Sequence, residues 1–328
     1  MTRLFKISLV AAALLVACAP FASASGHKPG SVLIYPVYDS DPGSGTLISI
    51  TNTKDDPSFN QNTNLNGVVD VHFVYIDGDY WSEFNRYERL TPNDTFSTLA
   101  SAHNPNSEKG FLYCIAIDPN THEPMSFNHL IGDEIVADGS GNWLVGFDAI
   151  AFKSLAAEGQ PGDIDGDERI DLDGVEYEAI ADEMYISSFV GDTGNIVPSL
   201  VLVSLVPSSD FRTRIDFEVF NDNEQQFSAT YNFRCWAWVE LKDIDSIFTS
   251  SALLGTNVDP RANGLSPATG WARLDGDDAV DVVGNEPKLD DPPFVGAVLK
   301  AYDYFSAGHL LHESDDANGL GGVLDTLQ

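Results

Sequence analysis

The sequence is poor in positive charge and in cysteine. It has 17 Lys and Arg against 50 Asp and Glu, a formal net charge of -33 over 328 residues. A surface this acidic repels phosphate backbones, so nucleic-acid binding is excluded. Beyond the N-terminal segment the only cysteines are Cys114 and Cys235. One disulfide at most can form, and we expect two buried thiols instead.

Long apolar runs and familiar catalytic motifs are also missing. After residue 24 no stretch approaches the roughly 20 apolar residues that a membrane-spanning helix needs. The chain has no Gly-x-Ser-x-Gly, no His-Glu-x-x-His and no phosphate-binding glycine loop, which disfavours those enzyme classes. Paired-carboxylate catalysis stays open, because two distant acids can meet in the fold without a sequence motif.

What is present is enough apolar material for packed cores, preceded by an export signal. Hydrophobic residues make up 43% of the chain. Residues 1–24 contain two cations, an apolar run and the small residues Ala22, Ser23 and Ala24, which predict a signal peptide. The segment ending at Cys18 also fits a lipoprotein cleavage box, which would place a lipid anchor on Cys18. We favour free secretion, and either route predicts an exported protein: extracellular, on the cell surface or periplasmic.

The same order of hydrophobic segments occurs twice, which predicts an internal duplication. Residues 32–37 and 46–53 correspond to residues 184–190 and 200–206, and alternating strand patterns follow in both copies. Gly110 corresponds to Gly270, and we align His129 with His309, both with a structural role. Turn residues recur roughly every 8 to 12 residues, as in all-β proteins.

The predicted fold class is therefore all-β, with two tandem antiparallel β-sandwiches of immunoglobulin-like or jelly-roll type. They would span residues 25–160 and 183–328, joined by an Asp-rich junction at residues 161–182. Short helix candidates lie at residues 152–157 and 243–254, among others, and no long helix is predicted.

The junction contains the string GDIDGDERIDLDGVEYE, whose alternating acids predict a calcium loop. Asp163, Asp165 and Asp167 occupy loop positions 1, 3 and 5, and the apolar Ile170 at position 8 would anchor the loop to a core. The alternative is a solvated acidic linker.

This string resembles the calcium loops of dockerin modules, EF-hands and thrombospondin type 3 repeats. The resemblance implies two further ligands, the backbone carbonyl of Arg169 and the side chain of Asp171. Glu168 replaces the usual glycine at position 6, and Gly174 stands where a bidentate acid is expected, so Asp173 or Glu176 would fill that place. The expected metal site comprises Asp163, Asp165, Asp167, Arg169, Asp171 and Asp173. The calcium would be structural.

A candidate ligand surface lies in the string FRCWAWVEL. Strand alternation places Arg234, Trp236 and Trp238 on one face. Two tryptophans beside an arginine could bind an extracellular carbohydrate or protein. The alternative, which we favour, is that they pack under the neighbouring domain or a loop.

Several motifs, including TLISITNT, GFLY and GWARLDG, resemble those of uncharacterised exported proteins of Gram-negative and related environmental bacteria. The resemblance implies export and a β-rich fold but no activity. We therefore expect a secreted or surface-attached, calcium-stabilised protein for binding, adhesion or extracellular scaffolding. The alternative is a polysaccharide-active hydrolase or lyase on the same scaffold, with the tryptophans as a sugar subsite.

Overall fold

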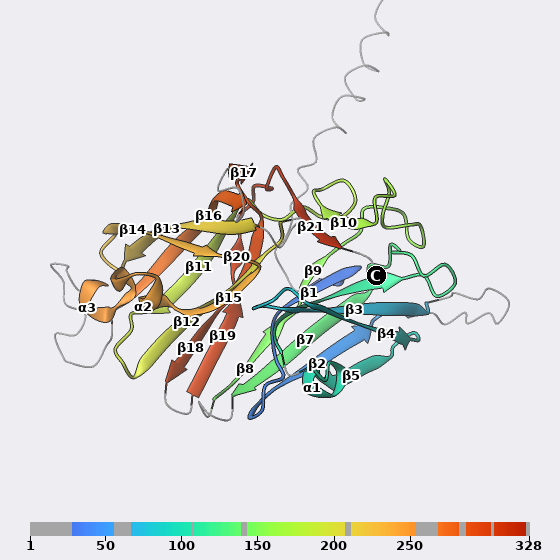
Figure 1. Cartoon of the computed structure of the whole chain (residues 1–328), viewed down its shortest axis with the longest axis horizontal. Coiled ribbons are helices and arrows are strands. Elements are labelled where there is room, and N and C mark those ends of the chain that lie inside the picture. The colour runs from blue at the N-terminus through green and yellow to red at the C-terminus, as the bar shows by residue number, and fades with distance from the viewer. Residues whose placement is uncertain are drawn as a thin grey trace, which may run out of the picture.

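The computed structural model describes residues 28–55, 67–106, 108–138, 143–206, 211–253, 268–281, 287–302 and 305–325. The signal segment with Cys18 lies outside these ranges. The fold is all-β, as predicted (Figure 1). In the described residues, no helix is long and apolar enough to cross a membrane.

The N-terminal half forms two antiparallel sheets. Sheet A has the strand order β5 (Thr95–Leu99), β2 (Ser44–Asn52), β7 (Leu130–Asp138) and β8 (Trp143–Asp148). Sheet B has the order β4 (Glu83–Leu90), β3 (Val69–Asp77), β6 (Lys109–Ile117), β1 (Val32–Asp39) and β9 (Ile150–Phe152). A short helix, α1 (Ala100–His103), follows β5.

The C-terminal half forms two sheets with the same connectivity. Sheet C has the order β15 (Trp236–Glu240), β12 (Ile196–Ser204), β18 (Phe294–Tyr302) and β19 (Phe305–Leu310). Sheet D has the order β14 (Gln226–Phe233), β13 (Phe211–Asn221), β16 (Thr269–Asp281), β11 (Glu183–Val190) and β20 (His312–Glu313), with β17 (Pro287–Asp290) beside β16. Strand for strand, sheets C and D repeat the order of sheets A and B. A common topology is what gene duplication would produce, and the duplication itself stays a prediction.

Two sequence expectations about local structure were wrong. Residues 152–157 form no helix, because Phe152 ends strand β9 and Ser154 bridges to Tyr177. The alignment of His129 with His309 was also wrong. His129 precedes β7, whereas His309 lies in β19, which takes the place of β8 rather than of β7. Residues 243–254 do contain short helical turns, η1 (Ser246–Phe248) and α3 (Ser250–Leu253), after α2 (Leu241–Ile244).

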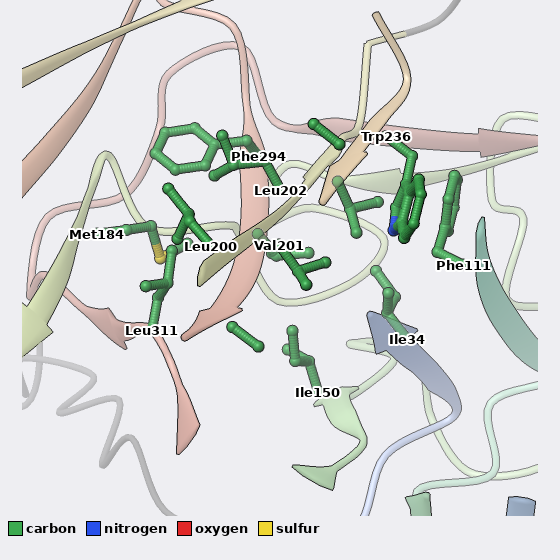
Figure 2. Packing of buried hydrophobic residues seen from close by; sticks show 14 of the residues in the cluster. Ile34, Phe111, Ile150, Met184, Leu200, Val201, Leu202, Trp236, Phe294 and Leu311 are labelled. Atoms are coloured by element: carbon green, nitrogen blue, oxygen red, sulfur yellow. The ribbon is translucent and has the colours of Figure 1, made fainter. Parts of the chain in front are cut away.

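Burial explains which strands alternate and which do not. In β13 every second residue is buried, because one face of sheet D is exposed. In β1, β3 and β12, nearly all residues are buried, since both faces of sheets B and C are covered. One face of sheet B packs on sheet A around Leu33, Phe73 and Leu112. Its other face joins a core that includes Val201 and Trp236 of sheet C (Figure 2).

The halves are therefore joined by an apolar seam between sheets B and C. At its centre β1 has a bulge between Tyr35 and Tyr38, where the ladder to β6 is interrupted. The Trp236 indole N–H donates to the Pro36 carbonyl at 2.9 Å, and the Val37 N–H donates to the buried Glu134 carboxyl at 3.3 Å. Backbone groups left by the bulge are thus satisfied by side chains from both halves.

Two glycines permit this close approach. A Cβ on Gly78 would lie 2.4 Å from the Trp236 ring. At the outer edge, a Cβ on Gly308 in β19 would lie 2.5 Å from the ring of Phe147 in β8. At both places the two halves can approach this closely because glycine has no side chain. Cys114 and Cys235 are buried free thiols, as predicted.

We expect Trp236→Phe to destabilise the protein. Phenylalanine keeps most of the apolar contact but removes the donor to Pro36, and an unsatisfied buried carbonyl costs about 1 to 3 kcal/mol. Urea unfolding measures the change. Trp271→Phe is the control, because Trp271 is 41% exposed on sheet D, and its effect should stay below about 1 kcal/mol. If both substitutions lower the free energy of unfolding equally, the bond from Trp236 to Pro36 does not stabilise the seam.

Candidate functional site

The Asp-rich junction folds as a loop that leads into strand β10 (Arg169–Leu172). This strand pairs antiparallel with β21 (Gly322–Asp325), with Ile170 opposite Leu324. Ile170 is fully buried. It anchors the loop to the core that lies between sheets B and C and extends through the C-terminal half, which we call the shared core. Its place at position 8 predicted this role. The chain then returns to the N-terminal half, where the Leu155 N–H donates to the Glu176 carbonyl at 2.7 Å.

Aspartate side chains fix the curvature of the loop through bonds to its own backbone. The Asp163 carboxylate accepts the N–H groups of Gly166 at 2.7 Å and Glu168 at 3.0 Å. Glu168 has a φ of 69°, the left-handed conformation that glycine favours. The replacement of the usual glycine at position 6 therefore changes the residue type without changing the backbone conformation expected there.

The curvature gathers carboxylates into two groups that could hold a metal ion. In each group the ligand oxygens lie within 4.8 Å of one another. The groups share Asp165 and consist of Asp163, Asp165 and Glu176, and of Asp165, Asp167 and Asp171. Four residues of the predicted site are thus brought together.

Two further ligands were predicted, the side chain of Asp173 and the backbone carbonyl of Arg169. Asp173 belongs to neither group, and its carboxylate accepts the Val175 N–H at 2.8 Å and the Glu176 N–H at 3.3 Å. Arg169, expected to offer its carbonyl, pairs with Asp325 in the ladder of β10 and β21.

Glu176 takes the place that the sequence left open between it and Asp173. It is only 4% exposed, although it is an acid in a polar loop. Its oxygens accept backbone N–H groups from Ile164, from Asp165 at 3.2 Å and from Asp171 at 3.4 Å. The signal was present in the sequence as an acid two residues after position 12, but only the turn at Gly174, with φ of 82°, brings it back to the loop.

Two carboxyl groups of the loop, Glu176 and Asp171, favour their neutral forms. Burial raises the pKa of Glu176, with a smaller contribution from Asp163. Burial also raises the pKa of Asp171, and the carboxylates of Asp167, Asp173 and Asp165 raise it further. Protons or a cation relieve this repulsion. A hard divalent cation prefers such all-oxygen ligands, so the donor set fits calcium in chemistry.

The second predicted surface lies at the edge of the seam. Trp236 is 8% exposed, so the favoured expectation of packing against the neighbouring half describes its position. Trp238, partly buried, meets Trp236 edge to face with ring centroids 6.4 Å apart. Both line a groove of about 830 Å³ together with the exposed Arg234. We call it the junction groove.

A smaller cavity of about 380 Å³ lies between β8–β9 and β19–β20. It is lined by His309 and His312, whose ring centroids are 5.9 Å apart, and by Glu313. Strand β19 ends at Leu310 and β20 begins at His312, so the two rings lie close together. In the part of the chain that is described, they join no group of three metal ligands. His309 Nδ1 lies 2.9 Å from its neighbour's carbonyl, a structural contact.

Comparisons with known proteins assign no family. No family model matches the chain, and no curated protein matches it. The chain is similar to the crystal structure of the CupB6 tip adhesin from Pseudomonas aeruginosa, with 9% identity over 93% of each chain and a TM-score of 0.14. A likeness at that TM-score carries no argument about fold or function.

We expect Glu176→Gln to destabilise the loop. A glutamine has one acceptor oxygen, and its amide group would face a backbone N–H, so one buried donor loses its partner at a cost of about 1 to 3 kcal/mol. Urea unfolding in chelator measures this cost. Glu168→Gln is the control, since Glu168 is exposed in the same loop and its substitution removes the same charge. If both variants unfold at the same urea concentration, the bonds assigned to Glu176 do not stabilise the loop.

Proposed function

We propose that this protein is exported and binds a partner outside the cell, as an adhesin or scaffold does, with its two β-sandwiches stabilised by calcium. The observation that carries the proposal is that two clusters of three carboxylates each share Asp165. These groups contain only carboxylate oxygens, which suit calcium, whereas zinc sites in proteins use mostly histidine and cysteine. Extracellular calcium modules bind in roughly the 0.1 to 1 mM range.

The position of the loop favours a structural ion. On one side β10 pairs with β21 near the C-terminal end of the chain. On the other side Ser154 bridges to Tyr177, and the Glu178 N–H donates to the Lys153 carbonyl at 2.9 Å. An ion held by Asp163 to Glu176 would therefore stabilise the segment that connects the two halves. Its positive charge would also offset part of the net charge of -33.

The calcium proposal predicts a higher melting temperature in calcium than in chelator. At a free concentration of about 100 times Kd, one site stabilises the folded state by about 2.7 kcal/mol, which corresponds to a rise of several degrees. Asp165→Asn should remove most of this rise, because Asp165 belongs to both groups. Differential scanning calorimetry measures the melting temperature, and isothermal titration measures binding.

Asp222→Asn is the matched control. Asp222 is an exposed acid in the turn after β13, and this variant should respond to calcium as the parent does. Equal melting in calcium and chelator, with no heat of binding, would reject the calcium proposal. If calcium raises the melting temperature of Asp165→Asn as much as that of Asp222→Asn, the ion binds at a site other than the loop.

A second candidate function is the polysaccharide hydrolase or lyase, and the junction groove is the observation that favours it. The groove places Asp39, Asp79, Asp138 and Glu240 along the same hollow as the two tryptophans. Burial raises the pKa of Asp39, as a general acid requires.

The enzyme candidate predicts that incubation with polysaccharide releases new reducing ends or unsaturated sugars. Loss of that activity in Glu240→Gln or Asp138→Asn would assign it to the groove, because each change removes a carboxylate that can act as acid or base. Asp222→Asn again serves as the control. Polysaccharide that stays intact after prolonged incubation in calcium would reject the enzyme candidate, and the binding function would remain.

A further inference from the structure

The junction groove exists because sheet C extends beyond the part that the N-terminal half covers. Val203, Trp236 and Val201 lie under that half, whereas Trp238, Ser199 and Glu240 lie further along the same face. The opposite wall comes from one end of the N-terminal half, where strands β1, β3, β6 and β7 begin or end. Its lining residues there are Asp39, Gly78, Asp79, Lys109 and Asp138.

The aromatic side of the groove is rigid. Trp236 is fixed by its bond to the Pro36 carbonyl and by the close approach of Gly78. Trp238 rests against it at an interplanar angle of 90°. Tyr231 and Phe233 also line the groove, and their rings stack with centroids 6.3 Å apart. Aromatic rings already held in place bind a ligand with little loss of conformational entropy.

The wall opposite the aromatic residues is also formed in advance. The Asp77 carboxylate accepts the N–H groups of Asp79 at 2.7 Å and Tyr80 at 3.3 Å, which fixes the β3–β4 turn. In the same turn Trp81 has a φ of 59°, a strained conformation for an aromatic residue. It is retained because the ring packs against the shared core.

The charges of the groove narrow the class of ligand. Four acids and the two bases Lys109 and Arg234 line it, so polyanions are repelled. Charged groups along both walls disfavour a purely apolar ligand, since they would lose water without a partner. A sugar chain meets both conditions, because each ring has an apolar face for aromatic stacking and hydroxyl groups that bond to carboxylates and guanidinium groups.

We propose that the junction groove binds an uncharged polysaccharide, with a sugar ring on the Trp238 side of the floor and its hydroxyl groups directed to Asp79, Glu240 and Arg234. This inference deepens the binding role proposed above and rests on it. It requires both halves, because the floor belongs to sheet C and the wall to the N-terminal half.

Isothermal titration of the calcium-loaded protein tests the inference with three neutral probes: cellohexaose, xylohexaose and fully N-acetylated chitohexaose. Binding of at least one neutral probe is expected, together with no binding of oligogalacturonate of similar length. Trp238→Ala should weaken that binding by roughly tenfold or more, as removal of a central aromatic contact does. Trp271→Ala is the matched control, because it removes a tryptophan that is exposed on sheet D, away from the groove, and it should bind as the parent does.

Asp79→Ala provides a second variant that leaves the core intact, since Asp79 is exposed in its turn, and it should also weaken binding. Failure of all three neutral probes, binding of oligogalacturonate with equal affinity, or equal losses in Trp238→Ala and Trp271→Ala would each overturn the inference. Calcium titration of the same samples separates the two proposals. If the protein binds calcium but no sugar, only the proposal for the groove is rejected. If it binds sugar but no calcium, only the calcium proposal is rejected.

Discussion

Burial of both faces of two central sheets is the constraint on which the structure depends. Sheet B is covered by sheet A on one side and by the seam with sheet C on the other, so its strands β1, β3 and β6 are buried almost throughout. The bulge of β1 interrupts the ladder of sheet B, and it leaves backbone groups that a seam buried from water cannot leave unpaired. Trp236 satisfies one of them from across the seam. A single indole therefore contributes apolar area and a hydrogen bond at the same point.

The same bulge accounts for a buried acid. Glu134 is fully buried, and its role is to accept the Val37 N–H inside the N-terminal sandwich. Burial raises its pKa well above the usual value, so the folded state holds its proton more tightly than the unfolded state. This contribution to stability is complete below the unfolded pKa and is lost as pH rises through the folded one. Glu176 in the loop, with its raised pKa, has the same sign, but a bound cation would reverse its preference by favouring the ionised form.

How much the sequence predicts depends on whether the signal is local. Period-two alternation placed β3 and β13, and the Asp spacing predicted four of the clustered acids and the buried Ile170. Coverage of both faces by a second sheet leaves a continuous apolar run, which identifies a strand but not its neighbours. The alignment of His129 with His309 was wrong for this reason. An apolar pair follows each histidine, but the two pairs belong to strands that are not equivalent. Glu176 depended on a turn whose direction is set by its contact with the N-terminal half.

Trp236 and Trp238 show most clearly where sequence reasoning stops. Alternation correctly predicts that they share a face of one strand, yet it cannot say how far along the strand the neighbouring half extends. The edge of that half falls between them: Trp236 lies under it and donates to Pro36, while Trp238 lies beside it on the floor of the groove. Two residues of strand, about 6.6 Å, separate a structural tryptophan from one available to a ligand. The covered ring also fixes the orientation of the uncovered one, so the packing of the halves and the shape of the groove depend on the same contact.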